Sequence, residues 1–235
     1  MPDVTNYGEH WKRIYHETYA SGKDFWRPEL ATPPEFAEFL DSPLAPRAPA
    51  RVLEAGCGDG LNAVYLARKG YTVTGVDIAD EAIIRAARLA RECGLSIEFL
   101  CGDLVQPLGR PETYDLWVDI KTLHVLWEND ERRAYLANAF ESLRSGGVLF
   151  LDCGLALADV REHFPKFFAA LDAEVRKGAD ILDRTLPRNL RGGIRCETLD
   201  WCQEELKSAG FEVLRAERVV SDESGWGMVL VARKS

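Results

Sequence analysis

Short apolar runs alternate with amphipathic segments along most of the chain from residue 51 onward. Five of the apolar runs have the length of buried strands, and they cover residues 51–55, 71–76, 97–101, 114–119 and 148–153. The segments between several of them carry apolar residues at helical spacing, and they include residues 63–67, 80–93 and 130–143. This alternation predicts an α/β fold, with a parallel sheet and helices on both of its faces.

The C-terminal part departs from this alternation. After a predicted helix at 200–208, two apolar runs at 212–220 and 226–232 are separated by a polar turn at 221–225. This pattern is typical of an antiparallel hairpin, which extends the sheet to seven strands, most of them parallel. Residues 155–195 are then an insertion before the last helix, where we expect a substrate lid.

The first 50 residues differ from the rest because aromatic side chains are frequent in them. Two segments, 8–19 and 34–40, are predicted to be helical. The proline-rich stretch 43–49 is typical of a linker. We therefore expect residues 1–50 to form an N-terminal helical arm or lid, and residues 51–235 to form the main domain.

Composition narrows the classes of function. The 235 residues are 46% hydrophobic and 29% charged, which is typical of a globular protein. The net charge of −9 disfavours a nucleic-acid partner, because phosphate binding needs a basic surface. Neither a signal peptide nor a membrane-length apolar span is visible, and the six cysteines show no C-x-x-C or zinc-type spacing. We therefore expect a cytoplasmic protein that has no membrane segment and binds no metal.

A glycine-rich turn follows the first predicted strand. Glu54 precedes Gly56, Gly58 and Gly60, and glycines at alternate positions allow the backbone to approach a ligand closely. The dinucleotide fingerprint G-x-G-x-x-G requires its third glycine at position 61, which is Leu61. A glutamate before the turn repels a pyrophosphate but suits a ligand that carries an ammonium group.

Carboxylates also follow the second and third predicted strands. Asp77 lies where such sheets place an acceptor for ribose hydroxyls, and Asp103 is placed to accept from the amine of adenine. Either residue alone is commonly a helix cap. Together with the glycine-rich turn, they favour S-adenosylmethionine over NAD as the ligand.

At these residues the sequence resembles the class I S-adenosylmethionine-dependent methyltransferases, over roughly residues 51–153 and the terminal hairpin. It looks closest to the small-molecule branch that includes thiopurine and tellurite-resistance-type methyltransferases. The segments that resemble this branch are FWRP at 25–28, PPEF at 33–36 and DIKTLH at 119–124. The resemblance implies a Rossmann-like sheet of order 3-2-1-4-5-7-6 with one antiparallel strand, and S-adenosylmethionine as cofactor.

The resemblance also assigns cofactor contacts by position. The methionine end is assigned to Glu54, Gly56, Gly58 and Gly60. The ribose is assigned to Asp77 and Ile78, and the adenine to Asp103 and Leu104. The backbone of Asp119 and Ile120 is expected near the sulfonium. Trp26 in the arm is either a residue that closes over the cofactor or a core aromatic.

Candidate substrate contacts follow the fourth strand and lie in the insertion. His124 is either a general base or a structural histidine that bonds the backbone, and Trp127 is either a substrate contact or a core aromatic. Lys121 departs from the family pattern, so the resemblance implies no role for it. Four arginines without an intervening acid form either a solvated loop or a lid that binds a carboxylate or phosphate, and they are Arg184, Arg188, Arg191 and Arg195.

Methyl transfer from a sulfonium is an in-line displacement on an activated carbon, so the enzyme mainly positions the nucleophile and excludes water. His124 is the one base candidate, which favours a thiol or other soft nucleophile, or an amine, as the acceptor. We expect a small-molecule substrate and a monomer or homodimer. Two other functions stay open: a NAD-type nucleotide-dependent oxidoreductase, and a non-catalytic S-adenosylmethionine-binding or interaction protein.

Overall fold

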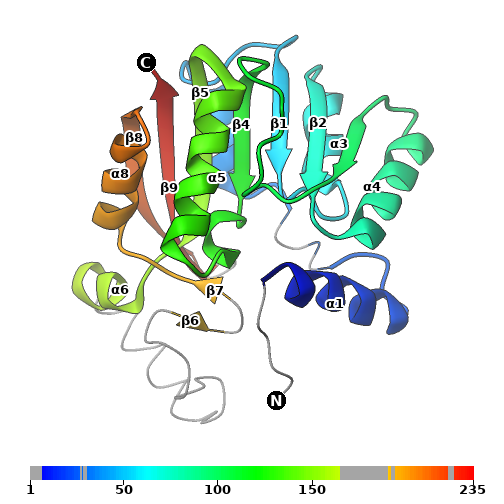
Figure 1. Ribbon diagram of the computed structural model, residues 1–235, viewed down its shortest axis with the longest axis horizontal. Coiled ribbons are helices and arrows are strands. Elements are labelled where there is room, and N and C mark those ends of the chain that lie inside the picture. Colours follow the sequence, from blue (N-terminus) through cyan, green and yellow to red (C-terminus); the bar gives the residue numbers. More distant parts are fainter. Residues whose placement is uncertain (1–6, 27, 29–30, 165–189, 192–193, 222–224) are drawn as a thin grey trace.

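A seven-stranded sheet forms the centre of the protein (Figure 1). The structure is a computed structural model that describes residues 7–26, 28, 31–164, 190–191, 194–221 and 225–235. The strands of this sheet are β1 (Arg51–Ala55), β2 (Thr72–Asp77), β3 (Glu98–Cys101), β4 (Tyr114–Ile120), β5 (Leu143–Gly154), β8 (Phe211–Ser221) and β9 (Gly225–Lys234). Their order is β3-β2-β1-β4-β5-β9-β8, and β9 runs antiparallel to both of its neighbours. The predicted order and the single antiparallel strand are confirmed.

The strands begin and end close to the predicted positions, with one exception. β5 starts at Leu143, five residues before the predicted strand. Its first residue pairs with Tyr114, but Val148 already pairs with Leu116. Gly146 and Gly147 therefore lie in an irregular part of β5, which extends the strand beyond its apolar run.

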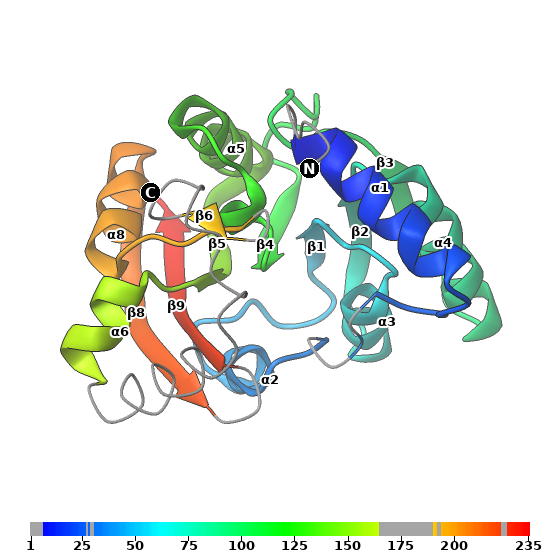
Figure 2. The ribbon, with the colours of Figure 1, turned by 90° about the horizontal axis from the view of Figure 1, so that it is seen from below.

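Helices cover both faces of the sheet, as predicted. The helices are α1 (Tyr7–Ala20), α2 (Pro34–Asp41), α3 (Leu61–Arg68), α4 (Asp80–Glu92), α5 (Asn129–Ser142), α6 (Leu157–His163) and α8 (Leu199–Ser208), with a 3-10 turn η2 (Leu123–Val125). Seen along the strands, α2 and α3 lie on one face, and α5 and α8 lie on the other (Figure 2). Within the described ranges, no helix has the length and apolar character needed to cross a membrane.

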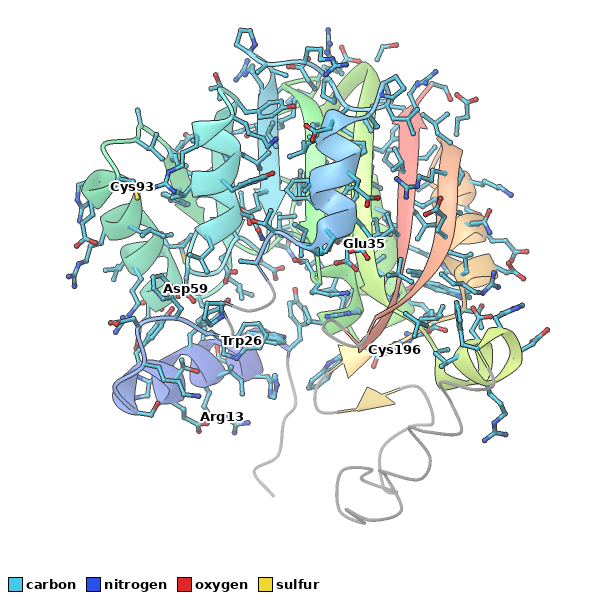
Figure 3. The ribbon with its side chains drawn as sticks, turned by 180° about the vertical axis from the view of Figure 1, so that it is seen from behind. Arg13, Trp26, Glu35, Asp59, Cys93 and Cys196 are labelled. Carbon is cyan, nitrogen blue, oxygen red and sulfur yellow. The ribbon has the colours of Figure 1, made fainter. Side chains whose placement is uncertain are left out.

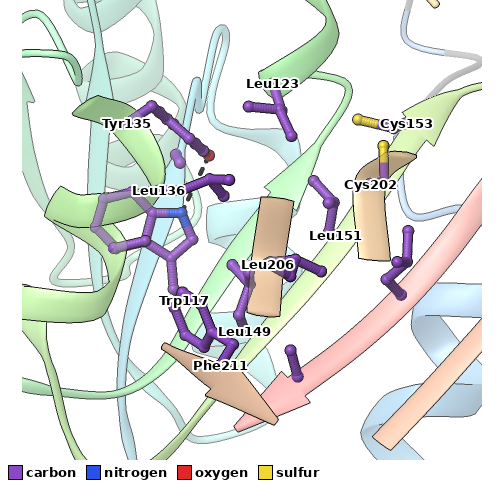
Figure 4. Packing of buried hydrophobic residues seen from close by; sticks show 14 of the residues in the cluster. Trp117, Leu123, Tyr135, Leu136, Leu149, Leu151, Cys153, Cys202, Leu206 and Phe211 are labelled. Atoms are coloured by element: carbon purple, nitrogen blue, oxygen red, sulfur yellow. Dashed lines mark hydrogen bonds between the residues drawn. The ribbon is translucent and has the colours of Figure 1, made fainter. Parts of the chain in front are cut away.

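The face under α5 and α8 buries the larger apolar cluster (Figure 4). Trp117 of β4 packs edge-on against Tyr135 of α5, and its indole nitrogen donates a hydrogen bond of 3.1 Å to the Tyr135 hydroxyl. Leu149 and Leu151 of β5 and Leu206 of α8 complete the contact, and all are fully buried. This packing fixes the end of β4, where site residues were predicted.

The opposite face is closed by α2, which comes from the first 50 residues. Pro34 occupies the first turn of this helix, where its fixed φ and missing N–H are compatible with helix initiation. Phe36 and Phe39 are fully buried, and their ring centroids lie 5.0 and 4.9 Å from that of Phe150 on β5. α2 therefore belongs to the packed core of the sheet.

The helix α1 lies across the edge of the sheet where β1, β2 and β4 end (Figure 1). It packs against α4, and His16 Nδ1 lies 2.8 Å from Glu81 Oε1. The insertion contributes α6 and a short hairpin of β6 (Leu190–Arg191) and β7 (Ile194–Arg195). Residues 165–189 and 192–193 of the insertion lie outside the described residues.

We expect Phe39→Ala to lower the free energy of unfolding by about 3–5 kcal/mol, because it leaves a cavity against Phe150. Ile84→Ala is the control, since Ile84 is 66% exposed, and it should change this free energy by no more than about 0.5 kcal/mol. Urea unfolding followed by circular dichroism measures both. Equally small changes in the free energy of unfolding of both variants would show that α2 contributes little to the apolar core on this face.

Candidate active site

The glycine-rich turn after β1 approaches two other segments too closely for side chains. Gly56 and Gly58 have φ of +64° and +49°, a region that L side chains rarely adopt. A Cβ on Gly56 would collide with the Thr122 side chain, and a Cβ on Gly58 would collide with the Tyr15 hydroxyl of α1. The glycines therefore allow the Thr122 side chain and the Tyr15 hydroxyl to approach the turn closely.

Asp77 connects this turn to the next loop. Its Oδ2 accepts a hydrogen bond of 2.9 Å from the Gly58 amide, and its Oδ1 accepts one of 2.9 Å from the Ala79 amide. Burial raises the pKa of Asp77 to about 6, although these amide bonds act in the opposite direction. The carboxylate thus holds the loops after β1 and β2 together at the edge of the sheet.

Asp103, after β3, is bonded to the arm. The Tyr7 hydroxyl donates a hydrogen bond of 2.5 Å to Asp103 Oδ1, which also accepts from the Val105 amide at 3.1 Å. The adjoining Leu104 carbonyl accepts from the Asn138 side chain at 2.8 Å. The residue predicted to contact adenine is therefore held from both sides.

The arm is attached at a second carboxylate, Asp59 (Figure 3). The Tyr19 hydroxyl donates to Asp59 Oδ1, and the Trp26 amide donates to Asp59 Oδ2 at 2.7 Å. The Arg85 guanidinium of α4 lies 3.7 Å from the centre of the Tyr19 ring, in cation–π geometry. Tyr19 and Trp26 thereby hold the arm on the glycine-rich turn.

Asp119 organises the turn after β4. It accepts hydrogen bonds from the Thr122 amide at 2.7 Å, the Leu123 amide at 2.9 Å and the Tyr135 hydroxyl at 2.6 Å. Burial raises its pKa to about 7. The side chain of Asp119 is thus engaged within the protein, while the neighbouring Ile120 lines the cavity described next.

A cavity lies between these loops and the arm. Its empty space is about 660 Å³, a figure that includes open solvent. Aromatic side chains of the arm and residues at the ends of β1 to β4 line it, and these include Tyr7, Trp11, Tyr15, Trp26, Gly56, Asp77, Ile78, Asp103, Leu104 and Ile120. An adjoining recess reaches Gly58, Asp59 and Asn62. Most of the predicted cofactor residues are thus brought to one place, but Glu54, Gly60 and Asp119 are not on the described lining.

Glu54 lies directly below the glycine-rich turn. It is 2% exposed, and its Oε2 has no hydrogen-bond partner among the described residues. Burial raises its pKa to about 8. The unpaired carboxyl oxygen is compatible with a cationic group on a ligand, but Glu54 is not on the described lining of either cavity, and its cofactor role stays a prediction.

His124 lies outside this cavity, as far as the described lining shows. It is buried, and its Nδ1 accepts a hydrogen bond of 2.9 Å from the Gly154 amide. Burial lowers its pKa well below the usual range, and the nearby Lys121 and Arg132 add to this. The backbone contact is of the structural kind foreseen for this residue, while its role as a base stays a prediction.

The predicted substrate residues are only partly described. Arg195 Nε lies 2.7 Å from Glu197 Oε1, and its NH1 donates to the Trp127 carbonyl at 2.6 Å. Trp127 itself packs partly buried against the larger core cluster. Arg184 and Arg188 lie outside the described residues, as does the side chain of Arg191.

Several residues at the cavity were missed as site residues by the sequence analysis. Trp11, Tyr15 and Tyr19 follow one another at four-residue spacing, which places them on one helix face and is the pattern that identifies them. Asp59 had no such pattern, because its partners Tyr19 and Trp26 are remote in sequence.

Comparison with known proteins agrees with this site. Residues 52–147 match the family described as methyltransferase domain. The chain is 28% identical over 200 residues to the ubiquinone biosynthesis O-methyltransferase of Cereibacter sphaeroides strain KD131, a match that covers 85% of this chain and 74% of that protein.

Solved structures share the fold. A 1,6-didemethyltoxoflavin-N1-methyltransferase of Burkholderia thailandensis, with bound 1,6-didemethyltoxoflavin and S-adenosylhomocysteine, has a TM-score of 0.70 at 23% identity and covers 100% of this chain and 92% of its own. The cyclase SpnF has a TM-score of 0.67 at 20% identity and covers 97% of this chain and 94% of its own. The fold alone therefore does not define the reaction.

The sheet order and the cavity at its carboxyl edge define a Rossmann-like α/β protein with a small-molecule site. Together with the methyltransferase-domain match over residues 52–147 and the similar methyltransferases, they support a class I S-adenosylmethionine-dependent methyltransferase. S-Adenosylmethionine is its cofactor, and the unpaired Glu54 oxygen and the tight turn at Gly56 fit that cation. The NAD-type alternative is not supported, since the matched family is a methyltransferase family.

We expect Glu54→Gln to alter the pH dependence of stability. The pKa of Glu54 is about 8 in the folded protein, against 4.5 for an ordinary glutamate, so folding takes up a proton between these values. The contribution of this proton uptake to the free energy of unfolding is fully present below about pH 4.5 and is lost as the pH rises through about 8.

Urea unfolding from pH 5 to 9 tests this expectation. The free energy of unfolding of the variant should increase relative to that of the wild type as the pH rises, because glutamine cannot ionise. A difference between the two that stays constant with pH would contradict the perturbed glutamate.

Proposed function

We propose that the protein transfers a methyl group from S-adenosylmethionine to a nucleophilic atom of a small molecule. The observation that supports a small acceptor is the aromatic arm, because Trp11, Tyr15 and Trp26 line the cavity and cover it. A cavity enclosed in this way admits a metabolite more readily than a folded macromolecule. The net charge of −9 also disfavours a nucleic-acid acceptor.

The residue roles in this proposal are those that the sequence predicted. Glu54 faces the ammonium of the methionine end, and the amides of the glycine-rich turn face its carboxylate. Asp77 accepts from the ribose hydroxyls with lone pairs that the Gly58 and Ala79 amides leave free. Asp103 and Leu104 contact the adenine, and Ile120 lies at the sulfonium.

S-Adenosylmethionine supplies a methyl group that is already activated by the sulfonium. The protein therefore needs to orient the acceptor and exclude water. Tyr7 and Tyr19 perform the second task, since their hydroxyls fasten α1 over the cavity at Asp103 and Asp59. In this proposal the part of residues 1–50 before α2 acts as a lid on the cofactor, while α2 packs in the core, and residues 155–195 act as a lid on the acceptor.

The acceptor atom is a separate part of the proposal. The sequence favoured a thiol or an amine, while the names of the two similar methyltransferases refer to methylation at an oxygen and at N1. We infer an oxygen or nitrogen acceptor.

The enzyme is further proposed to act in the cytoplasm as a monomer or homodimer. The cysteines of the described residues are all free, which agrees with a reducing compartment.

We expect Asp77→Ala and Asp77→Asn to weaken the binding of S-adenosylhomocysteine about 10- to 100-fold, because each removes a charged hydrogen-bond acceptor. Isothermal titration calorimetry measures the dissociation constants. Asp130→Ala is the control, since the Asp130 side chain is fully exposed on α5, and its affinity should equal that of the wild type. Unchanged binding in both Asp77 variants would remove the ribose role.

The function itself is tested by release of S-adenosylhomocysteine over a panel of phenols, enols, amines, thiols and carboxylates. We expect turnover with at least one oxygen or nitrogen acceptor. Tight binding of S-adenosylhomocysteine without turnover over the whole panel would favour a non-catalytic cofactor-binding protein.

A further inference from the structure

Lys121 has a backbone conformation that its sequence position does not predict. It follows β4 directly and has φ of +69°, in the left-handed region that is unfavourable for a side chain other than glycine, asparagine or aspartate. Strained residues of this kind cluster at functional sites, where the surrounding structure holds them. Here the Lys121 amide donates a hydrogen bond of 2.8 Å to the Asp152 carbonyl of β5, which fixes the conformation.

Lys121 lies at the wall of the cavity described above. Lys121 lines both the main cavity and the adjoining recess. The other ionisable residues on the described lining carry carboxyl, phenol or thiol groups. They are Asp59, Asp77, Asp103, Tyr7, Tyr15, Tyr135 and Cys57. Lys121 is thus the one cation on the described walls of an otherwise acidic site.

The ammonium group is held in place by a buried carboxylate. Lys121 Nζ lies 2.5 Å from Asp152 Oδ1, and the Asp152 side chain is 7% exposed. Burial raises the pKa of Asp152, Lys121 opposes this, and Glu35 at the start of α2 adds to it. Figure 3 shows Glu35 at the end of α2 nearest this edge of the sheet. The pair places one N–H group on Asp152, and the other two have no hydrogen-bond partner among the described residues and are open to a ligand.

The position of Nζ indicates which ligand this is. It lies 3.2 Å from the place of a Cβ on Gly227 of β9, on the side of β4 away from β1, β2 and β3. The residues proposed for the cofactor lie on those three strands and their loops. The ammonium therefore lies toward the part of the sheet edge formed by β4, β5 and β9. We take this part, away from the proposed cofactor contacts, as the place of the methyl acceptor.

We propose that Lys121 binds the ionised oxygen of the methyl acceptor, so that the enzyme selects a small molecule with an acidic hydroxyl, such as a phenol or an enol. Asp152 is the positioning residue that keeps the ammonium oriented. This inference rests on the proposed methyl-transfer function and adds the acceptor class to it.

The reaction balances with these groups alone. The acceptor hydroxyl loses its proton to solvent when it ionises against the Lys121 ammonium. An oxygen lone pair then forms the new O–C bond while the methyl–sulfur bond breaks, and the electrons of that bond stay on sulfur. Anion and sulfonium give two neutral products, and Lys121 keeps all of its protons.

A coloured probe tests the binding step without turnover. In the presence of saturating S-adenosylhomocysteine, 4-nitrophenol should bind as its yellow phenolate, so that its apparent pKa falls on the enzyme. Lys121→Met should abolish this shift, Lys121→Arg should retain most of it, and Asp152→Asn should reduce it. No shift with the wild type would overturn the proposal.

Turnover and cofactor binding give the second measurement. For phenol or enol acceptors, we expect Lys121→Met to lower kcat/KM about 10²- to 10³-fold, as removal of an oxyanion donor does, and Lys121→Arg to restore part of it. The control is Lys69→Met, since Lys69 lies on the surface beside Asp41, and it should match the wild type in every assay.

The affinity for S-adenosylhomocysteine separates the possible failures. It should be the same in Lys121→Met and in the wild type. A parallel loss of this affinity would mean that Lys121 binds the methionine carboxylate or maintains the fold, and an equal loss on amines and phenols would also contradict selection of an oxyanion. If the wild type itself does not bind S-adenosylhomocysteine, the proposed function fails rather than this assignment.

Discussion

The active site depends on carboxylates that are buried at the ends of parallel strands and are satisfied by neutral donors. Asp77 accepts from the Gly58 and Ala79 amides, and Asp119 accepts from two amides and a tyrosine hydroxyl. Burial of a charge is costly unless hydrogen bonds compensate it, and here the compensating amides belong to the loops that form the cavity. The same bonds that stabilise the carboxylates therefore shape the site. One carboxyl oxygen of Glu54 has no hydrogen-bond partner among the described residues, and a cationic group of a ligand would supply one.

The arm extends the same principle. Tyr7 and Tyr19 donate to Asp103 and Asp59, so two further carboxylates at this edge are satisfied by phenol groups from α1. These contacts explain why an acidic protein holds an aromatic helix against its acidic edge. They also place apolar rings over the cavity, which lowers its exposure to water and strengthens electrostatic interactions inside it.

The sequence predicted the sheet well because its strands are short apolar runs that end in glycine or acid. The order of strands and the meeting of Asp77, Asp103 and the glycine-rich turn followed from topology, since parallel strands end at one edge. The contacts of the arm could not be predicted, because they join residues up to 96 positions apart and no local pattern specifies them. The conformation of Lys121 was equally hidden, since only its pairing with β5 imposes it.

The central claim is that the site is an acidic cavity prepared for a cationic ligand. Isothermal titration calorimetry of S-adenosylhomocysteine at pH 7, in two buffers that differ in ionisation enthalpy, tests it most directly. Because the pKa of Glu54 is about 8 before binding, the ammonium of the ligand should lower it and release a proton from the wild type but not from Glu54→Gln. Binding that releases no proton, or takes one up, would contradict the account.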